Sequence, residues 1–368
     1  MKKVFLYVLL TVPCFWCCKS VPTPSADYMI LDEVRYINRF PQVFTLTNGE
    51  AVDLDIIGAF SISVQDSLLI VCTTNGEGMW SFFGLPDHKY LGKYLTRGNG
   101  PNELRSPPSL ENQFFLKEQG ELFAKIFLYS TGKLYRMNIS ETLQKNRLSM
   151  NEPDSISRGL YDLCFIDNST FLRKESNSER TQLTRYIWRN GEKVSSKNVE
   201  NLNKALIKQT GDLRKQIEDI AILSTYTKSS PDGNRIVEAS PWLNVINLYS
   251  LDDSFGRTIC VGKRIENISR VQQMERMDRR FTYMRVYVYP KFFGVLYNDT
   301  VNVKYGEEEV YNRSIRFFDW DGNPLSELKL EGNILDYAID FIYGTLYTLN
   351  RDTEEILKYD IREILKKL

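Results

Sequence analysis

The stretch Arg97-Gly98-Asn99-Gly100-Pro101-Asn102-Glu103 lies between two apolar runs, and the fold can be worked out from it. Gly98 and Gly100 can adopt positive φ without steric cost. Pro101 holds its own φ at about −65° and pushes Gly100 toward an extended conformation. These restrictions favour a shaped, hydrogen-bonded crossover between strands over a flexible linker.

Two interpretations of this heptapeptide stay open. It is a turn between strands, since turns favour Gly, Pro and Asn, or Arg97 and Glu103 point into a shared cleft. A phosphate-binding loop is the least supported, because the sequence lacks both the Gly-x-x-x-x-Gly-Lys-Ser/Thr spacing and the third glycine of a dinucleotide-binding turn.

The composition is that of a globular protein without a basic surface. The 368 residues are 42% hydrophobic and 26% charged, with 47 basic and 47 acidic side chains. Without the leader described below, 45 basic and 47 acidic residues remain, a net charge of −2 that gives no electrostatic case for nucleic acid. The 21 Tyr and 20 Phe residues, with a single His, suit β-strands better than metal chemistry.

Residues 1–18 are typical of a lipoprotein signal peptide. Lys2 and Lys3 precede an apolar run that is too short to cross a bilayer as a helix and ends at Cys17 and Cys18. Cys18 is the predicted lipidated residue, because Cys17 before it is smaller than the Trp16 that precedes Cys17. An ordinary cleaved signal and a poorly cleaved anchor remain alternatives. Residues 19–38 are polar and predict a tether.

From residue 39 to residue 368 the chain repeats a pattern of short strands. Phe60-Ser61-Ile62-Ser63-Val64 alternates strictly, and three more short strands follow before Arg97. Six such units follow one another at about 45–55 residues, the period of four-stranded propeller blades, and they begin near Phe60, Phe114, Tyr161, Ile222, Tyr283 and Tyr337. The sixth unit lacks an outer strand, which residues 43–54, read as two strands around an Asn48-Gly49 turn, could supply. An open sandwich is the alternative.

The order aromatic-x-x-Arg-Gly-x-Gly-Pro-x-Glu, from Tyr94 to Glu103, follows the first of these units. With this motif placed after a hydrophobic repeat of strands, the chain resembles the six-bladed, TolB-like β-propeller lipoproteins of Bacteroidetes envelopes. The resemblance implies an all-β propeller closed by an N-terminal strand, and a lipid-anchored protein of the envelope. In that class an acidic cluster after the lipidated cysteine marks export to the surface, and none follows Cys18, so the periplasmic side of the outer membrane is favoured and surface exposure stays open.

Two segments depart from the strand pattern. Residues 202–222 and 268–281 carry apolar residues at helical spacing with basic residues alongside, which predicts two small helical insertions. They either pack over a blade end or form a cationic lid over the channel. Cys72, Cys164 and Cys260 fall in apolar strands of distant units, which predicts buried thiols and no disulfide framework.

Catalytic and metal motifs are weak. His88, the only histidine, falls in a predicted solvated turn and cannot complete a Ser/His/Asp triad on a distant face. No Cys or His cluster suggests zinc. Carboxylates near strand ends could hold calcium, as propeller lactonases do, but no spacing singles them out; they are Asp53, Asp162, Asp219 and Asp340.

The sequence therefore favours a binding module over an enzyme, without deciding between them, and predicts a small molecule, glycan or protein held at the channel mouth. A calcium-dependent propeller hydrolase or lyase, and a scaffold for envelope proteins, are the alternatives. No cofactor is predicted, although calcium stays possible. The candidate residues of the channel mouth are Arg97, Asn99, Glu103, Trp242 and Arg280.

Overall fold

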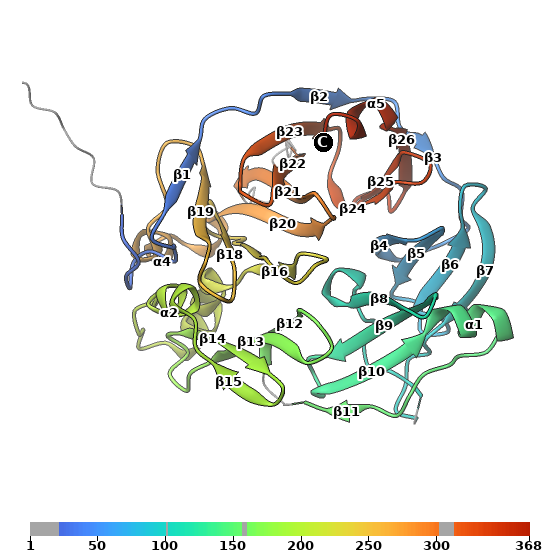
Figure 1. The fold of residues 1–368 in the computed structure, drawn as a ribbon, viewed down its shortest axis with the longest axis horizontal. Coiled ribbons are helices and arrows are strands. Elements are labelled where there is room, and N and C mark those ends of the chain that lie inside the picture. The colour runs from blue at the N-terminus through green and yellow to red at the C-terminus, as the bar shows by residue number, and fades with distance from the viewer. Residues whose placement is uncertain (1–21, 101, 157–159, 302–312) are drawn as a thin grey trace, which may run out of the picture.

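The computed structural model describes residues 22–368 except 101, 157–159 and 302–312. The signal peptide and Cys18 therefore lie outside the described residues. Six blades, each with four antiparallel strands, surround a common axis, and two of the blades carry a fifth strand that pairs in parallel at the outer edge (Figure 1). This confirms the predicted six-bladed β-propeller.

The first three blades are each formed by consecutive strands. From the axis outward, blade 1 consists of β4 (Ala59–Gln65), β5 (Leu68–Thr73), β6 (Trp80–Gly84) and β7 (Lys89–Tyr94). Blade 2 consists of β8 (Phe114–Glu118), β9 (Glu121–Leu128), β10 (Lys133–Asn138) and β11 (Asp154–Ser155). Blade 3 consists of β12 (Leu160–Phe165), β13 (Thr170–Ser176), β14 (Leu183–Arg189) and β15 (Glu192–Val194).

The last three blades each take an additional or closing strand from the N-terminal segment. Blade 4 consists of β16 (Tyr226–Ser229), β17 (Ile236–Ala239), β18 (Val245–Tyr249) and β19 (Gly256–Val261), with β1 (Val34–Ile37) outside it. Blade 5 consists of β20 (Arg280–Val288), β21 (Phe292–Val301), β22 (Arg313–Asp319) and β23 (Pro324–Leu330), with β2 (Val43–Leu46) outside it. Blade 6 consists of β24 (Ile334–Asp340), β25 (Thr345–Asn350), β26 (Ile356–Asp360) and β3 (Glu50–Ala51).

The N-terminal segment is a belt around half of the ring (Figure 1). β1 and β2 pair in parallel with β19 and β23, while β3 pairs antiparallel with β26 and completes blade 6. The predicted closure is thus confirmed for Glu50–Ala51. The predicted hairpin across Asn48-Gly49 is wrong, because its two halves cover the edges of neighbouring blades. Covering three outer edges removes backbone groups that could otherwise pair with another chain.

The segment predicted as a polar tether, residues 19–38, contacts the insertions from Ala26 onward and is buried from Met29. Met29, Ile30 and Leu31 are buried, and the amide of Leu31 donates to Thr258 Oγ1 at 2.8 Å. Three consecutive apolar side chains outweigh the polar residues around them, because their burial removes apolar surface from water.

The first predicted helix, over residues 202–222, is divided. Its segment forms α2 (Lys197–Asn203), α3 (Leu213–Asp219) and the 3₁₀ turn η2 (Ile220–Leu223). Asp212 is the reason, since its carboxylate accepts from the amides of Arg214 and Lys215 and so begins a new helix. The apolar face predicted for a single helix is also wrong, because Leu206, Leu213 and Ile217 are exposed.

The second insertion contains α4 (Ile268–Gln273) and the 3₁₀ turn η3 (Arg276–Asp278). Buried residues of both insertions pack with Met29, Ile30 and Leu31 and with blades 3 and 4 in one core cluster. The insertions therefore lie at the rim of the ring, as α2 and α4 show in Figure 1, so the structure supports packing against the blades and not the alternative of a lid over the channel. The remaining helical elements are η1 (Leu110–Asn112), α1 (Ile139–Lys145) and α5 (Arg362–Leu365).

The three cysteines of the described chain are buried and free, as predicted. His88 does lie in a turn, at a φ of 56°, but it is half-buried and its Nε2 is 3.0 Å from the hydroxyl of Tyr347. It therefore links blade 1 to blade 6, and the prediction of a solvated residue is wrong. No helix of the described residues is both long and apolar enough to cross a membrane.

Candidate functional site

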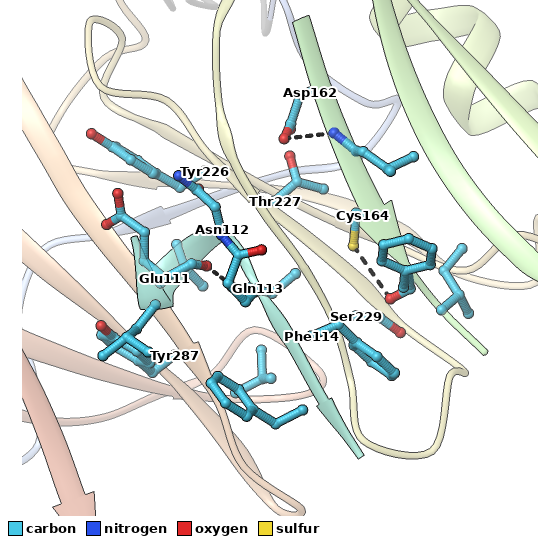
Figure 2. A pocket seen from close by; sticks show the side chains of 18 of the residues that line it. Glu111, Asn112, Gln113, Phe114, Asp162, Cys164, Tyr226, Thr227, Ser229 and Tyr287 are labelled. Carbon is cyan, nitrogen blue, oxygen red and sulfur yellow. Dashed lines mark hydrogen bonds between the residues drawn. The ribbon is translucent and has the colours of Figure 1, made fainter. Parts of the chain in front are cut away.

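A cavity of about 850 Å³ lies at the centre of the ring. Its walls come from the innermost strands of five blades, namely β4, β8, β12, β16 and β20, together with η1. Figure 2 shows side chains from η1, β8, β12, β16 and β20 around it, among them Glu111, Phe114, Asp162, Tyr226 and Tyr287. The connection from blade 1 to blade 2 begins at Leu95 and leads to η1, so this connection supplies part of the cavity wall.

Glu111 enters the cavity wall from η1 and meets charged groups from two other blades. Its carboxylate forms an ion pair with Arg285 of β20, whose Nε also lies 3.6 Å from Asp336 Oδ1 in β24. Asp336 accepts hydrogen bonds from the hydroxyl of Tyr287 at 2.5 Å and from the amide of Ile62 at 3.0 Å. One guanidinium thus lies between two carboxylates that the sequence separates by 225 residues.

Burial dominates the titration of both carboxylates. It raises the pKa of Glu111 to about 7, although Arg285 and Lys228 oppose the rise. Burial also raises the pKa of Asp336, again against the pull of Arg285. The site therefore holds a carboxyl that changes charge near neutral pH.

Lys228 of β16 contributes the second cation of this part of the wall. Its ammonium donates to the backbone carbonyl of Glu111. Burial lowers the pKa of Lys228, while the neighbouring acidic groups Cys164, Glu111 and Asp162 oppose the fall.

A second charged cluster continues from the cavity wall into the interface of blades 3 and 4. Asp162, which lines the cavity, accepts from Lys174 Nζ at 3.0 Å, and the same ammonium lies 3.1 Å from Glu238 Oε2. Arg185 Nη2 contacts Glu238 Oε2 at 2.9 Å. Tyr249 also donates to the Glu238 carboxylate, at 2.7 Å.

Glu238 is fully buried, with Lys174 and Arg185 almost as inaccessible. Burial alone would raise the pKa of Glu238, but Arg185 and Lys174 outweigh burial and hold its pKa well below the usual range. The cluster is satisfied by charge and by hydrogen bonds, which is the condition under which buried ions are tolerated.

Each charged side chain that lines the cavity has a partner. Glu111 pairs with Arg285, Asp162 with Lys174 and Lys117 with Asp66 at 2.8 Å, while Lys228 donates to the Glu111 carbonyl. The rest of the polar lining is uncharged and consists of hydroxyl and amide groups. Aromatic rings lie among them and are those of Phe114, Phe115, Tyr129, Tyr161, Phe165, Tyr226 and Tyr287.

The residues of the Arg97 loop lie away from this lining. Arg97 and Asn99 are exposed, and the Glu103 carboxylate accepts from the amide of Gly100 at 2.7 Å. A Cβ on Gly98 would come within 1.9 Å of Glu103 Oε2, so the glycine permits this close approach. The loop is thus a hydrogen-bonded turn. The described residues show no cleft that Arg97 and Glu103 line together.

Trp242 and Arg280 are also outside the cavity lining. Trp242 packs edge-on against Phe281 with ring centroids 5.1 Å apart, and Arg280 is exposed, with Nη2 3.4 Å from the hydroxyl of Tyr297. The structure places none of the five predicted channel-mouth residues among those that line the cavity. Their part in ligand binding stays a prediction.

The residues that the sequence analysis missed are Glu111, Lys228, Arg285 and Asp336. Arg285 and Asp336 stand in innermost strands between apolar neighbours, which could have marked them, whereas Lys228 stands between Thr227 and Ser229 and carries no such signal. Glu111 stands in a short 3₁₀ turn and carries no such signal.

The carboxylates considered for calcium do not come together. Asp219 is buried in the helical insertion with Arg279, Asp340 accepts amides in the β24–β25 turn, and Asp53 is exposed. No group of three or more His, Cys, Asp or Glu residues among the described residues could hold a metal ion.

Comparison with known proteins places the chain among propellers. A family model described as TolB-like 6-blade propeller-like matches residues 48–341. No curated protein matches the chain.

Solved structures with a similar course of the chain are distant in sequence. Hydrazine synthase of Kuenenia stuttgartiensis is 15% identical over 87% of this chain and 82% of that chain, with a TM-score of 0.45. Regucalcin of Agrobacterium tumefaciens, a calcium-binding protein, is 11% identical over 87% and 95%, with a TM-score of 0.42. The Pan2 WD40 domain of Neurospora crassa is 11% identical over 83% and 89%, with a TM-score of 0.43.

Proposed function

The chain belongs to the TolB-like six-bladed propeller family, and from this premise we propose that it is a binding module whose central cavity holds a neutral, hydroxyl-rich ligand such as a saccharide. The observation that carries the proposal is that three of the four charged side chains in the cavity lining form ion pairs and the fourth, Lys228, donates to a backbone carbonyl. A charged ligand would lose its hydration without finding an unmatched opposite charge, and such burial is costly.

The uncharged lining supplies what a saccharide needs. Hydroxyl and amide groups such as those of Ser229, Asn112 and Gln65 can exchange hydrogen bonds with a polyol. Aromatic faces such as that of Tyr161 can cover its apolar C–H surface. A cavity of about 850 Å³ is within the range of small-ligand sites.

We further propose that the protein is a lipoprotein, anchored through Cys18 to the outer membrane and facing the periplasm. The basic start, the apolar run and the terminal cysteines of residues 1–18 support this anchoring. Acyl chains on one cysteine would provide the membrane affinity through their buried methylene groups.

Ligand binding is tested first with a glycan array carrying neutral and acidic glycans, followed by calorimetric titration of each glycan retained. We expect the wild-type chain to bind neutral glycans. Tyr161→Ala should weaken that binding at least about tenfold, which corresponds to the loss of about 1.4 kcal/mol of stacking. Tyr161 is the aromatic residue of the lining that is most accessible to a ligand, at 36% exposed.

Tyr90→Ala is the matched control, because Tyr90 is also an exposed tyrosine but lies on β7, the outermost strand of blade 1. It should bind as the wild type does. Preference for acidic glycans, or equal binding by the two variants with unchanged unfolding midpoints, would contradict a neutral ligand in the cavity.

The anchor is tested by feeding cells an alkyne analogue of palmitate and detecting it on the chain. Label is expected on the wild type and on Cys17→Ser, and it should be lost in Cys18→Ser, since the acceptor sulfur is then missing. Label retained by Cys18→Ser but lost by Cys17→Ser would move the anchor to Cys17. Label missing from the wild type would reject lipidation.

A further inference from the structure

Four apolar side chains of the helical insertions are exposed to solvent. Leu206 is 40% exposed, Leu213 69%, Ile217 44% and Met277 53%. They make up four of the eleven large hydrophobic residues that are exposed in the described part of the chain. We call these four side chains the insertion face.

The elements that carry the insertion face are tied to one another. Leu213 and Ile217 are one turn apart on α3 and so lie on the same side of that helix. Glu218 and Arg276 form an ion pair at 3.6 Å. They are the sequence neighbours of Ile217 and Met277. α3 and η3 therefore lie together, and Met277 is close to the α3 residues.

Buried polar groups hold this arrangement in place. Gln272 of α4 accepts from the amide of Lys208 at 2.8 Å and donates to its carbonyl at 2.7 Å, and it also donates to Asp219. Asp219 pairs in turn with Arg279. Buried polar contacts therefore hold in place the elements that carry the exposed apolar side chains. Exposed apolar side chains that are held in this way indicate an interaction surface.

The surroundings of the insertion face are basic. Residues 204–219 and 263–280 hold ten basic and six acidic side chains, whereas basic and acidic residues are equal in number over the whole chain. Lys204, Lys208, Arg214 and Lys215 belong to the same stretch as the apolar residues. Apolar side chains among basic ones match a bilayer surface with anionic headgroups.

The N-terminal end of the described chain lies at the same place. The carbonyl of Ala26 accepts from the amide of Leu206 at 3.0 Å, and that of Asp27 from the amide of Ile268 at 3.0 Å. Cys18 precedes Ala26 by eight residues. Even fully extended, eight residues span at most about 29 Å, so an anchor at Cys18 would keep Leu206 close to the membrane.

We propose that the insertion face rests on the anionic surface of the membrane that holds the Cys18 anchor, and this rests on the lipidation proposed above. Figure 1 shows α2, α4 and the start of the described chain at the rim of the ring, beside blades 3 and 4. The ring then stands with its rim on the bilayer. Both ends of the central channel stay open to the aqueous phase, where a soluble ligand can reach the cavity.

The test uses the processed, lipidated chain in vesicles of phosphatidylethanolamine and phosphatidylglycerol. A bimane fluorophore is placed on Ile217→Cys or, as the control, on Tyr90→Cys, where the native side chain is also exposed, at 55% against 44%, but lies on blade 1. The three native cysteines of the described chain are buried, and unlabelled wild type measures any reaction with them. We expect emission at position 217 to shift to shorter wavelength and to be quenched by nitroxide-labelled lipid, with neither effect at position 90.

Equal quenching at the two positions would overturn the proposal. A shift at position 217 without quenching by the lipid would assign the insertion face to contact with a second copy of the chain and overturn the proposal as well. Unchanged quenching in phosphatidylcholine vesicles would reject the role of the basic residues. Failure of the anchor is recognised separately by missing palmitate label on the wild type, whereas normal label with equal quenching rejects only the membrane contact.

Discussion

Replacing Glu238 by glutamine is expected to lower the free energy of unfolding by about 3–5 kcal/mol. The reason is that Arg185 and Lys174 are almost completely buried and would lose their common counter-charge. Tyr249 and Thr225 also donate to this carboxylate, at 2.7 Å each. Glutamine keeps the shape of the glutamate side chain, so the loss of stability reflects the missing charge and not a new cavity.

Urea unfolding at neutral pH measures this loss. Glu363→Gln is the control, since Glu363 pairs with Lys366 on the surface and is 79% exposed, and it should change stability by less than about 0.5 kcal/mol. A change below about 1 kcal/mol for Glu238→Gln would show that the cluster is not closed to water as the geometry requires.

The pH dependence of this loss has a definite sign. The pKa of Glu238 is lower in the folded chain than its ordinary value of 4.5. Its stabilisation is therefore complete above about pH 4.5 and is lost as the pH falls toward the folded pKa. The difference between the wild type and Glu238→Gln should shrink in acid.

Glu111→Gln is expected to remove a pH dependence of opposite sign. Burial raises the pKa of Glu111 from 4.5 to about 7 in the folded chain. Between about pH 4.5 and pH 7 the folded chain keeps a proton on Glu111 that the unfolded chain has released. The wild type should therefore lose stability as the pH rises. At 1.36 kcal/mol per pKa unit the full loss is about 3.4 kcal/mol, of which about 2–3 kcal/mol falls between pH 5 and pH 8.

The measurement compares urea unfolding of the wild type and of Glu111→Gln at pH 5 and pH 8. The wild type should lose stability relative to the variant over this interval, because groups common to both chains contribute nearly equally. Glu192→Gln, on the exposed outer strand β15, should follow the wild type. Parallel curves for the wild type and Glu111→Gln would show that Glu111 titrates as an ordinary surface carboxyl.

The blades could be predicted from the sequence because the forces that define them are local. Phe60-Ser61-Ile62-Ser63-Val64 became β4, since alternation places one set of side chains on each face of a strand whatever lies beyond it. Cys72, Cys164 and Cys260 were placed correctly in buried strands for the same reason. The count of six units then followed from the repeat.

The course of the N-terminal belt and of the insertions was decided by packing at a distance. Val43–Leu46 carries a strand pattern, but only the neighbouring outer edge determines that it joins blade 5 and not blade 6. Helical spacing in residues 202–222 predicted a single helix, whereas the buried Asp219–Arg279 pair and the Asp212 cap favour the separate short elements α2, α3 and η2. Local periodicity contains no information on such partners.

By itself the sequence determined the architecture and its six repeats. The tertiary structure alone decided the site. Glu111, Lys228, Arg285 and Asp336 belong to different blades and meet because ring closure brings the innermost strands to one axis. Burial there, which no single segment creates, is what shifts the pKa of Glu111 and matches each lining charge with a partner.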